Sequence, residues 1–337
     1  MTIYCRPIAQ AGPRPVPGAL PLAGGWCWFD RVEVLERGRP PAFLSASELP
    51  AEVQARLCAP RAPVPGLGAG APRLMGILNT TPDSFSDGGL FDAPERALAQ
   101  ARAMVAGGAD ILDIGGESTR PGAEEVPETD EIARTVPVIE AIRAEWTGAI
   151  SIDTRKATVA RAALAAGAGL VNDVSGFGHD PAMPGLVAES GAPVCLMHTP
   201  GPPETMQSLA TYDDLLLDVY DWLAGRVAIA EAAGIPRDRI LVDPGIGFGK
   251  TAEQNLTLLA GLSLFHGLGC QVLLGASRKR FIGTFGGAEA PRDRMPGSVA
   301  VALHGVAQGV QVLRVHDIGE TRQALSLWMA SVKGIPG

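Results

Sequence analysis

Residues 74–79 read LMGILN, an apolar run that stops at an asparagine. Seven further runs of this kind follow it along the chain, and each leads into small or polar residues. They are DILDIG (110–115), AISIDT (149–154), LVNDVS (170–175), PVCLMH (193–198), ILVDPG (240–245), QVLLGAS (271–277) and QVLRVHD (311–317). Continuous Val, Ile and Leu runs are typical of strands that are buried on both faces, and such strands belong to parallel sheets. The sequence therefore predicts eight parallel strands of the α/β class.

Longer Ala-rich segments with helical spacing separate most of these runs. Thr251 followed by Gln254 forms a capping box for one predicted helix, and Asp92 is a predicted N-cap for another. Eight strand–helix units in about 265 residues match the size of a (β/α)8 TIM barrel. A doubly wound open sheet would more usually have about five to seven strands and a GxGxxG turn, which the sequence lacks. We therefore predict a barrel over residues 73–337.

The first 72 residues differ in composition from the rest, because they contain 12 of the 28 prolines. This density permits only short elements, such as a strand over residues 29–36 and a helix over residues 47–57. Residues 59–72 (APRAPVPGLGAGAP) read as a linker. We predict that residues 1–72 form a Pro/Gly-rich N-terminal appendage packed on the barrel; a regulatory or partner-binding module is the alternative.

Composition excludes several classes of protein. The net charge of −8 disfavours a nucleic-acid binder, which normally carries a basic face. Five widely spaced cysteines without a CxxC pair indicate neither a disulfide framework nor a zinc site. The proline-rich start is unlike a signal peptide, and no segment approaches the roughly 18 to 20 apolar residues that span a bilayer. We therefore expect a cytoplasmic protein with no membrane partner.

In a barrel of this kind, catalytic residues gather at the C-terminal ends of the strands. Taken alone, Asp153 or Asn172 could cap a helix or bond loop backbone. Asp173 should point away from the barrel interior, and His198 alone is more typical of a structural residue. Polar residues nevertheless occur at the same end of strand after strand, which predicts a single site. They are Asn79, Glu117, Thr119, Arg120, Asp153, Asn172, Asp243, Ser277, Lys279, Arg314 and His316.

Two loops that follow the first two strands are too long for simple connectors. Residues 80–91 (TTPDSFSDGGLF) and 116–126 (GESTRPGAEEV) are rich in Gly, Pro, Ser and Asp, and we predict that they act as lids. Arg120 offers a bidentate guanidinium suited to phosphate oxygens. The segment DPGIGFGK (243–250) lacks the spacing of a Walker A loop, so its glycines are predicted to let Phe248 approach a flat ligand.

Together these segments resemble the dihydropteroate synthase family of pterin-binding barrels. The resemblance covers all eight strand ends, in order, from residue 73 to about residue 330. The motifs that carry it are LNTTPDSFSDGG (78–89), DIGGESTRPGA (113–123), SIDTRK (151–156), VNDVSG (171–176), CLMH (195–198), DPGIGFGK (243–250), SRKRFIG (277–283) and RVHD (314–317).

The resemblance implies condensation of 6-hydroxymethyl-7,8-dihydropterin pyrophosphate with 4-aminobenzoate, which gives 7,8-dihydropteroate and pyrophosphate. It implies a pterin pocket of Asp153, Asn172, Met197, Asp243, Phe248, Lys279 and Arg314. Mg²⁺ is the implied cofactor, with Asn79 and Asp87 as its ligands. The implied diphosphate site is Asn79, Thr119, Arg120, Arg314 and His316, and the implied aminobenzoate site is Phe85, Pro121, Ser277 and Lys279. The residues assigned to catalysis are Asp87, Asp153, Lys279, Arg314 and His316.

Two alternatives remain open within this fold. A methyltransferase that uses a reduced folate should lack the TPDSF, STRPG and SRK segments, which are present here. A catalytically silent pterin-binding paralogue should have lost a diphosphate-binding residue, and all of them are present. One departure lies in the loop after the fifth strand, where His198-Thr199-Pro200-Gly201 replaces the His-Met-Gln-Gly of many relatives. The family also implies a homodimer.

Overall fold

The computed structural model describes residues 3–12, 15–68, 70–81, 93–119 and 122–333. Its centre is a closed parallel barrel in which each strand pairs with the next along the chain and the last pairs with the first. The eight strands are β7 (Arg73–Asn79), β8 (Ile111–Gly115), β9 (Ala149–Asp153), β10 (Leu170–Asp173), β11 (Val194–Met197), β12 (Ile240–Asp243), β13 (Gln271–Leu274) and β14 (Val312–Val315). The predicted (β/α)8 barrel is therefore confirmed, with each strand inside or within one residue of its apolar run.

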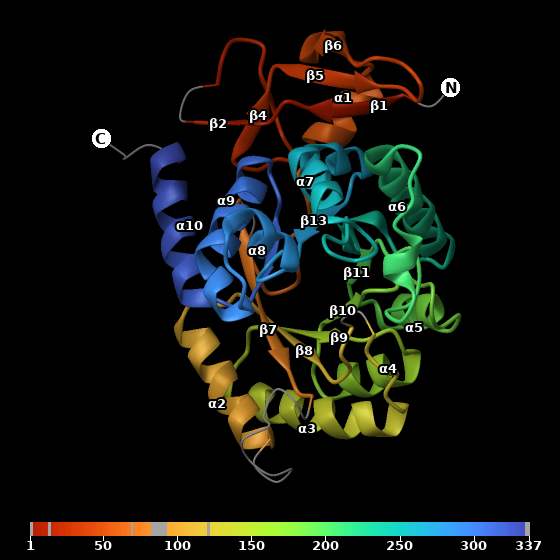
Figure 1. Ribbon diagram of the computed structural model, residues 1–337, viewed down its shortest axis with the longest axis vertical. Helices are drawn as coiled ribbons and strands as arrows, with labels where there is room; N and C mark the ends of the chain where they lie inside the picture. Colours follow the sequence, from red (N-terminus) through yellow and green to blue (C-terminus); the bar gives the residue numbers. More distant parts are fainter. Residues whose placement is uncertain (1–2, 13–14, 69, 82–92, 120–121, 334–337) are drawn as a thin grey trace.

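Helices surround the barrel on its outer face (Figure 1). They are α2 (Ala93–Ala106), α3 (Glu128–Glu145), α4 (Ala157–Ala165), α5 (Met183–Ser190), α6 (Leu215–Ala232), α7 (Ala252–Ala260), the short α8 (Arg280–Gly286), α9 (Met295–Ala307) and α10 (Ile318–Lys333). Short 3-10 turns lie among them: η3 (Met206–Leu209), η4 (Arg237–Arg239), η5 (Leu262–Leu268) and η6 (Pro291–Arg294). The predicted capping box of α7 is confirmed, since the Thr251 hydroxyl accepts from the Gln254 amide and the Gln254 side chain accepts from the Thr251 amide. Asp92 lies outside the described residues.

The N-terminal end of the barrel is filled by apolar side chains. Seven of the eight strands each contribute one inward-facing side chain to an apolar layer at this end: Met75, Ile111, Leu170, Cys195, Leu241, Leu273 and Val312. Val64 of the linker packs against the same cluster from below and is almost fully buried. Because side chains alternate between the two faces of a strand, the residues two and four positions further along each strand lie above this layer.

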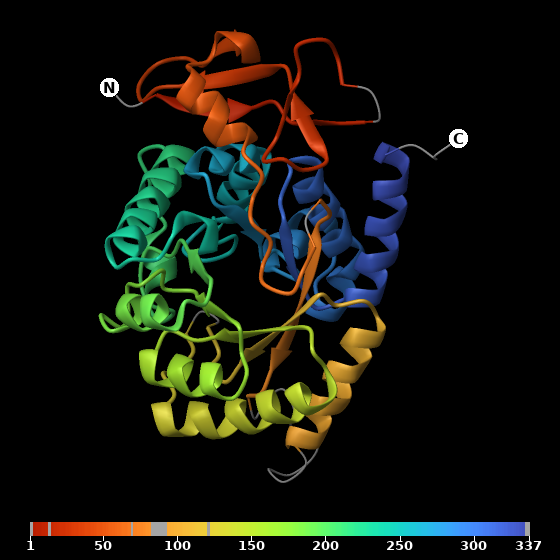
Figure 2. The same cartoon turned by 180° about the vertical axis from the view of Figure 1, so that it is seen from behind.

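The N-terminal segment forms two small antiparallel sheets that lie over the N-terminal end of the barrel (Figures 1 and 2). One contains β1 (Tyr4–Pro7), β5 (Arg31–Leu35) and β6 (Ala42–Ser45), and the other contains β2 (Gln10–Ala11), β4 (Cys27–Phe29) and β3 (Leu20–Pro21). The turn η1 (Ala46–Glu48) and helix α1 (Ala51–Cys58) follow. These elements have a buried cluster of their own that includes Phe29, Val32 and Leu57.

Two predicted elements of this segment were wrong in their bounds. The single strand expected over residues 29–36 is divided at Asp30 into β4 and β5, which belong to different sheets; the Asp30 side chain accepts from Gln10. The helix expected over residues 47–57 begins at Ala51, because Pro50 precedes it and Ser45 caps the separate turn η1.

Polar contacts join this segment to the barrel helices. The Tyr4 hydroxyl donates to Asp221 at 2.8 Å, and the Trp26 indole donates to the carbonyl of Val306 at 2.8 Å. In the linker, Arg61 donates to the carbonyls of Cys270 and His266. Within the described residues, no helix has the length and apolar character needed to cross a membrane.

Candidate functional site

The mouth of the barrel is formed by inward-facing residues at the carboxyl ends of the strands. Cross-strand register places Asn79 beside Gly115 and Gly115 beside Asp153, and it pairs Asp153 with Asn172 and Met197 with Asp243. Polar groups from successive strands thus face one interior space, as the sequence predicts.

Arg314 of β14 crosses this space and links two carboxylates from the other side of the barrel. Its Nε donates to Asp113 Oδ2 at 2.6 Å, and its Nη2 donates to Asp153 Oδ2 at 2.6 Å. Asp113 is fully buried and Asp153 nearly so. One guanidinium is therefore shared by two acids in a region with little water.

This arrangement controls the ionisation of Asp153. Burial, followed by repulsion from the neighbouring acids Asp113, Glu131 and Asp173, raises the pKa of Asp153 to about 7 against the attraction of Arg314. Arg314 cannot neutralise both acids fully, because a single positive charge serves two carboxylates. A carboxyl that titrates near neutrality in a pocket is a common feature of binding and catalytic sites.

Two asparagines lie beside these acids. Asn172 donates from Nδ2 to Asp113 Oδ2 at 3.1 Å. Asn79 and Asp153 both lie close to Gly115. A Cβ atom built on this glycine would be 3.5 Å from Asn79 Oδ1 and 3.5 Å from Asp153 Cβ. Asn79, Asp153 and Asn172 therefore converge around the centre of the mouth.

Asp243 and Lys279 form the opposite wall. An ideal Cβ atom on Gly275 would lie 3.4 Å from Asp243 Oδ2 and 3.9 Å from Arg314 Cβ, so Asp243 is close to the central arginine. The Lys279 ammonium lies 4.2 Å from the centroid of the Phe248 ring. Burial lowers the pKa of Lys279 to about 7, opposed by Asp243 and assisted by Arg314.

The loop after β12 brings Phe248 to this wall. Gly245 has a φ of +69°, and a Cβ atom there would lie 2.0 Å from the His198 carbonyl oxygen, so a side chain cannot be accommodated. The buried Lys250 donates to the carbonyls of Gly245 and Phe248, both at 2.9 Å, and its Nζ lies 2.9 Å from His198 Nδ1. Burial and Lys250 lower the pKa of His198 to about 2. The structural role predicted for His198 is therefore confirmed, since it supports this loop.

Asp173 also has the structural role that strand alternation predicts. It is fully buried and accepts from the amides of Ser175 and Phe177, each at 2.8 Å. On the other side of the mouth, the Ser277 hydroxyl lies 2.9 Å from His316 Nδ1 and accepts from the His316 amide.

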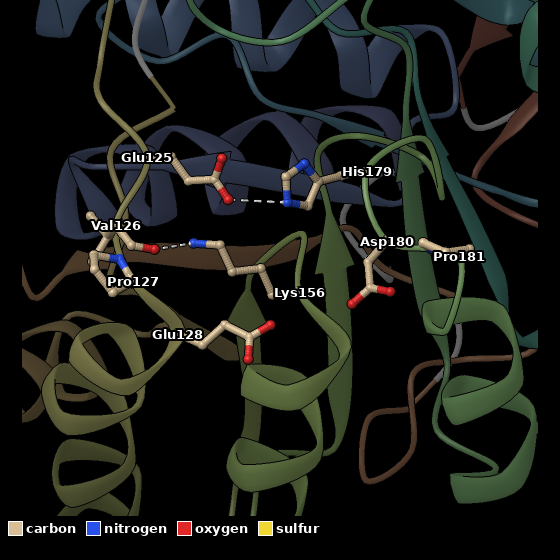
Figure 3. A pocket seen from close by; sticks show the side chains of 8 residues that line it. All are labelled: Glu125, Val126, Pro127, Glu128, Lys156, His179, Asp180 and Pro181. Carbon is tan, nitrogen blue, oxygen red and sulfur yellow. Dashed lines mark hydrogen bonds and ion pairs between the residues drawn. The ribbon is translucent and has the colours of Figure 1, made fainter.

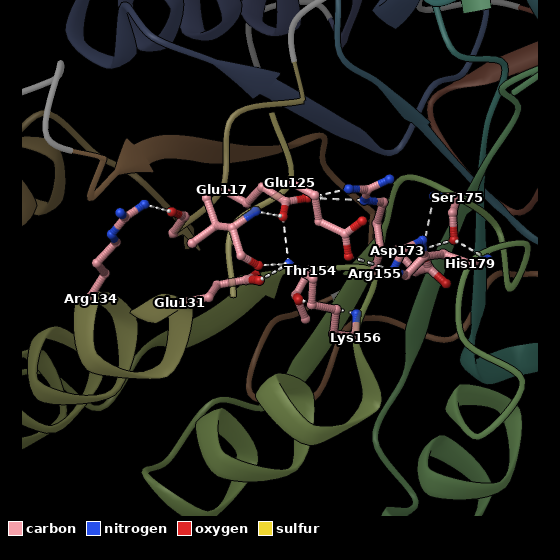
Figure 4. A network of polar contacts seen from close by, with 12 residues as sticks. Glu117, Glu125, Glu131, Arg134, Thr154, Arg155, Lys156, Asp173, Ser175 and His179 are labelled. Carbon is pink, nitrogen blue, oxygen red and sulfur yellow. Dashed lines mark hydrogen bonds and ion pairs between the residues drawn. The ribbon is translucent and has the colours of Figure 1, made fainter. Parts of the chain in front are cut away.

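The loop after β8 is fixed at its base by a buried network of charges (Figure 4). Glu117 accepts from the Arg155 guanidinium, from the Lys156 ammonium and, at 2.9 Å, from the amide of Val126. Lys156 also donates to Glu131 of α3 at 2.8 Å. Glu117 therefore ties both ends of the loop to the end of β9; the sequence placed it at the mouth but gave it no part in binding a substrate.

An open pocket of about 660 Å³ lies on the outer side of this network (Figure 3). Its lining includes Lys156 and the Glu125–His179 ion pair, whose atoms are 3.4 Å apart. Among the described residues, those assigned to the site from the sequence do not line it. A second cavity, of about 350 Å³, does include two of them, Thr119 and Phe248.

The sequence missed one residue at the centre of the mouth, Asp113, because it lies inside the run DILDIG and not at its end. Strand alternation could have identified it, since Ile111, Asp113 and Gly115 share a face. Phe85, Asp87, Arg120 and Pro121 lie outside the described residues, so their predicted roles stay predictions.

Three buried polar atoms near this centre lack a hydrogen-bond partner within the described part of the chain: Asp113 Oδ1, Ser151 Oγ and Asp153 Oδ1. Buried polar atoms are normally paired, so unsatisfied ones are suited to a ligand with hydrogen-bonding groups of its own. A flat heterocycle with several N–H donors would satisfy the two carboxylates.

Comparison with known proteins identifies close relatives. A family described as pterin binding enzyme matches residues 75–316. The dihydropteroate synthase of Synechocystis sp. is 48% identical over 259 residues, which cover 76% of this chain and 90% of the relative. The dihydropteroate synthase of Escherichia coli is 43% identical over 261 residues, covering 77% of this chain and 92% of the relative.

Solved structures agree with this result. The dihydropteroate synthase of Xanthomonas albilineans in complex with 7,8-dihydropteroate has a TM-score of 0.74 and 44% identity, covering 82% of this chain and 100% of that chain. The same enzyme with 4-aminobenzoic acid has a TM-score of 0.75 and 47% identity, covering 79% of this chain and 94% of that chain.

Proposed function

This chain belongs to the pterin-binding enzymes and, within them, to the dihydropteroate synthases of folate biosynthesis, and from this premise we propose how its barrel mouth performs the reaction. The enzyme joins 6-hydroxymethyl-7,8-dihydropterin pyrophosphate to 4-aminobenzoate. A carbon–nitrogen bond forms at the pterin methylene, the carbon–oxygen bond to the diphosphate breaks, and the amine loses a proton. One observation carries the proposal: Asp153, Asn172, Asp243, Lys279 and Arg314 converge in a single mouth.

The pterin ring binds in the space between Arg314 and Lys279. Carboxylates accept from N–H groups, and amides can both donate and accept, so Asp153, Asn172 and Asp243 can read the edge of a pterin by paired hydrogen bonds. Met197 and Phe248 provide apolar surface for the ring faces. In its ionised form, Asp153 would stabilise positive charge as it develops on the ring; its pKa, raised to about 7, makes both the ionised and the protonated form accessible near neutral pH.

The diphosphate leaves from a carbon next to an electron-rich ring, so charge separates strongly in the transition state. Preorganised cations and N–H donors that face the developing negative charge are the main source of rate enhancement for such a step. We assign this task to Arg314 and His316, with Asn79 and Thr119 nearby; Arg120 completes the predicted set.

Mg²⁺ is proposed as the cofactor, held by Asn79 and, outside the described residues, by Asp87. Asn79 fits this role because its amide oxygen is a hard ligand that faces the mouth. Mg²⁺ prefers oxygen ligands, and phosphate oxygens and water commonly complete its coordination where a protein supplies one or two side chains. When bound, the ion would neutralise charge on the leaving group.

The aminobenzoate binds at the rim, between Ser277 and Lys279 on one side and the predicted Phe85 and Pro121 on the other. We further propose a homodimer in the cytoplasm. Phe285 of α8 and Leu327 of α10 are apolar side chains that are 53% and 73% exposed, and a dimer interface would cover such surface. All five cysteines are free, which fits a reducing compartment. Sedimentation of the purified protein tests the dimer.

The experiment that tests the function is pyrophosphate release by the purified protein with Mg²⁺ and the pterin pyrophosphate, with and without aminobenzoate. We expect release that depends on aminobenzoate and falls at least about 100-fold in Lys279→Ala, because the site loses the amino group that lies between Asp243 and Phe248. The side chain of Arg161 in α4 is 62% exposed and makes a surface ion pair with Glu189, so Arg161→Ala serves as the control for removal of a cation outside the site. Tight pterin binding by the parent without any release would instead identify a silent paralogue.

A further inference from the structure

Asp113 occupies a position in the mouth that the sequence pattern did not reveal. We propose that Asp113 is a positioning residue for pterin recognition, whose single oxygen Oδ2 fixes both the amide of Asn172 and the guanidinium of Arg314. This inference rests on the proposed function, because it names the residue that sets the specificity of that same site.

The geometry of Asp113 is unusual for a strand residue in a barrel interior. It lies in the middle of β8, is fully buried and has Ser151 of β9 as its cross-strand neighbour. Its Oδ2 accepts from Arg314 Nε at 2.6 Å and from Asn172 Nδ2 at 3.1 Å. Residues from three strands, β8, β10 and β14, are thus joined through one oxygen atom.

The consequence for Asn172 is a fixed amide orientation. Because Asn172 Nδ2 donates to Asp113 Oδ2, the NH₂ group of Asn172 faces Asp113. The amide oxygen of Asn172 is then turned away from Asp113 and can accept from a ligand. Asp113 therefore selects a ligand that presents an N–H donor to Asn172, although Asp113 acts through Asn172 and need not touch the ligand there.

The consequence for Arg314 is a fixed guanidinium plane. Asp113 holds Nε and Asp153 holds Nη2, and no residue in the described part of the chain accepts from Nη1. Two carboxylates that bind one planar guanidinium group determine its orientation as well as its position. Nη1 is left to interact with substrate, and neither acid alone would fix the plane.

The test is a double-mutant cycle on the full-length protein, with Asp113→Asn, Asn172→Ala and the double variant. The readout is the dissociation constant of 6-hydroxymethyl-7,8-dihydropterin by calorimetry, together with KM for each substrate in pyrophosphate release. We expect Asp113→Asn to weaken pterin binding about 10- to 100-fold, the loss typical of a buried charged hydrogen-bond partner. KM for aminobenzoate should stay within about twofold, and the Asp113→Asn effect on pterin binding should shrink at least about threefold in the Asn172→Ala background.

Asp110→Asn is the matched control. Asp110 lies one residue before β8 and, like Asp113, forms ion pairs with arginine side chains, in this case Arg73 and Arg322. This substitution should lower the melting temperature and leave pterin binding unchanged. If Asp113→Asn does not fold, Asp113→Ser, which is uncharged and smaller, replaces it in the cycle. Unchanged pterin binding, an equal rise in both KM values, or strict additivity with Asn172→Ala would overturn the proposal. Since calorimetry needs no turnover, failure of the proposed activity is seen separately, in the parent protein.

Discussion

The two ends of strand β8 both carry clusters of carboxylates and guanidinium groups, but the ratio of acids to arginines is reversed between them. At the N-terminal end, the carboxylate of Asp110 is shared by two arginines, Arg73 and Arg322. At the mouth, the guanidinium of Arg314 is shared by two carboxylates, Asp113 and Asp153.

Burial gives these two clusters different consequences. The side chains of Arg73, Arg322 and Asp110 are 24%, 30% and 16% exposed, so water screens the excess positive charge. Asp113 and Asp153 are buried, and this burial, together with repulsion between the neighbouring acids, raises the pKa of Asp153. A similar set of residues therefore stabilises the fold at one end of a strand and supplies binding chemistry at the other.

The strongest test of this contrast is to remove an arginine from each end. Arg314→Ala should lower kcat/KM at least about 1,000-fold, because it removes a preorganised donor for the leaving group and unpairs two buried acids. Arg322→Ala should leave kcat/KM within about twofold. Pyrophosphate release at subsaturating pterin pyrophosphate measures both, and similar losses in the two variants would remove the distinction between the ends.

The apolar layer beneath the mouth should affect stability alone. Leu273→Ala removes a fully buried side chain from the same apolar cluster as Val64 and should lower the free energy of unfolding by about 3 kcal/mol. KM for both substrates should stay near the parental values, because the layer does not reach the mouth. Urea denaturation and steady-state kinetics are the measurements, and Leu256→Ala, on the exposed face of α7, is the control expected to change neither.

Stability should also depend on pH through Asp153. Its pKa is raised from 3.8 in the unfolded chain to about 7 in the folded protein. Between these values the folded state holds a proton that the unfolded state has lost, so this group makes stability fall as pH rises through the window and contributes no further change above pH 7. The free energy of unfolding of Asp153→Asn, measured relative to that of the parent, should therefore increase by on the order of 2 kcal/mol from pH 5 to pH 7. A difference that does not vary with pH in urea titrations would contradict the raised pKa.

The smallest expected effect is at the cap of α7. Thr251→Ala removes the hydroxyl that accepts from the Gln254 amide and should cost about 1 kcal/mol of unfolding free energy. Activity should be unchanged, since the cap lies in the helical layer. Thr251→Ser retains a capping hydroxyl and should recover most of the stability; failure to do so would assign the loss to the methyl group instead.

The strands and most of the mouth could be predicted because their signals are local. Eight buried strands appear as apolar runs, and the polar residue at the end of each run marks the mouth, as Asn79, Asp153 and Asp243 do. In the N-terminal segment the local signals were weaker, since a strand was predicted across Asp30 and the structure divides it between two sheets.

The sequence by itself determined the barrel, the direction of its strands and the edge at which its polar residues gather, because alternation and apolar runs are properties of neighbouring residues. Only the tertiary structure decided that Asp113 shares Arg314 with Asp153, that Glu117 ties the β8 loop to Arg155 and Lys156, and that Val64 fills the barrel from below. The physical reason is that hydrogen-bond partners and desolvation depend on side chains far apart in the chain, which barrel closure alone brings together.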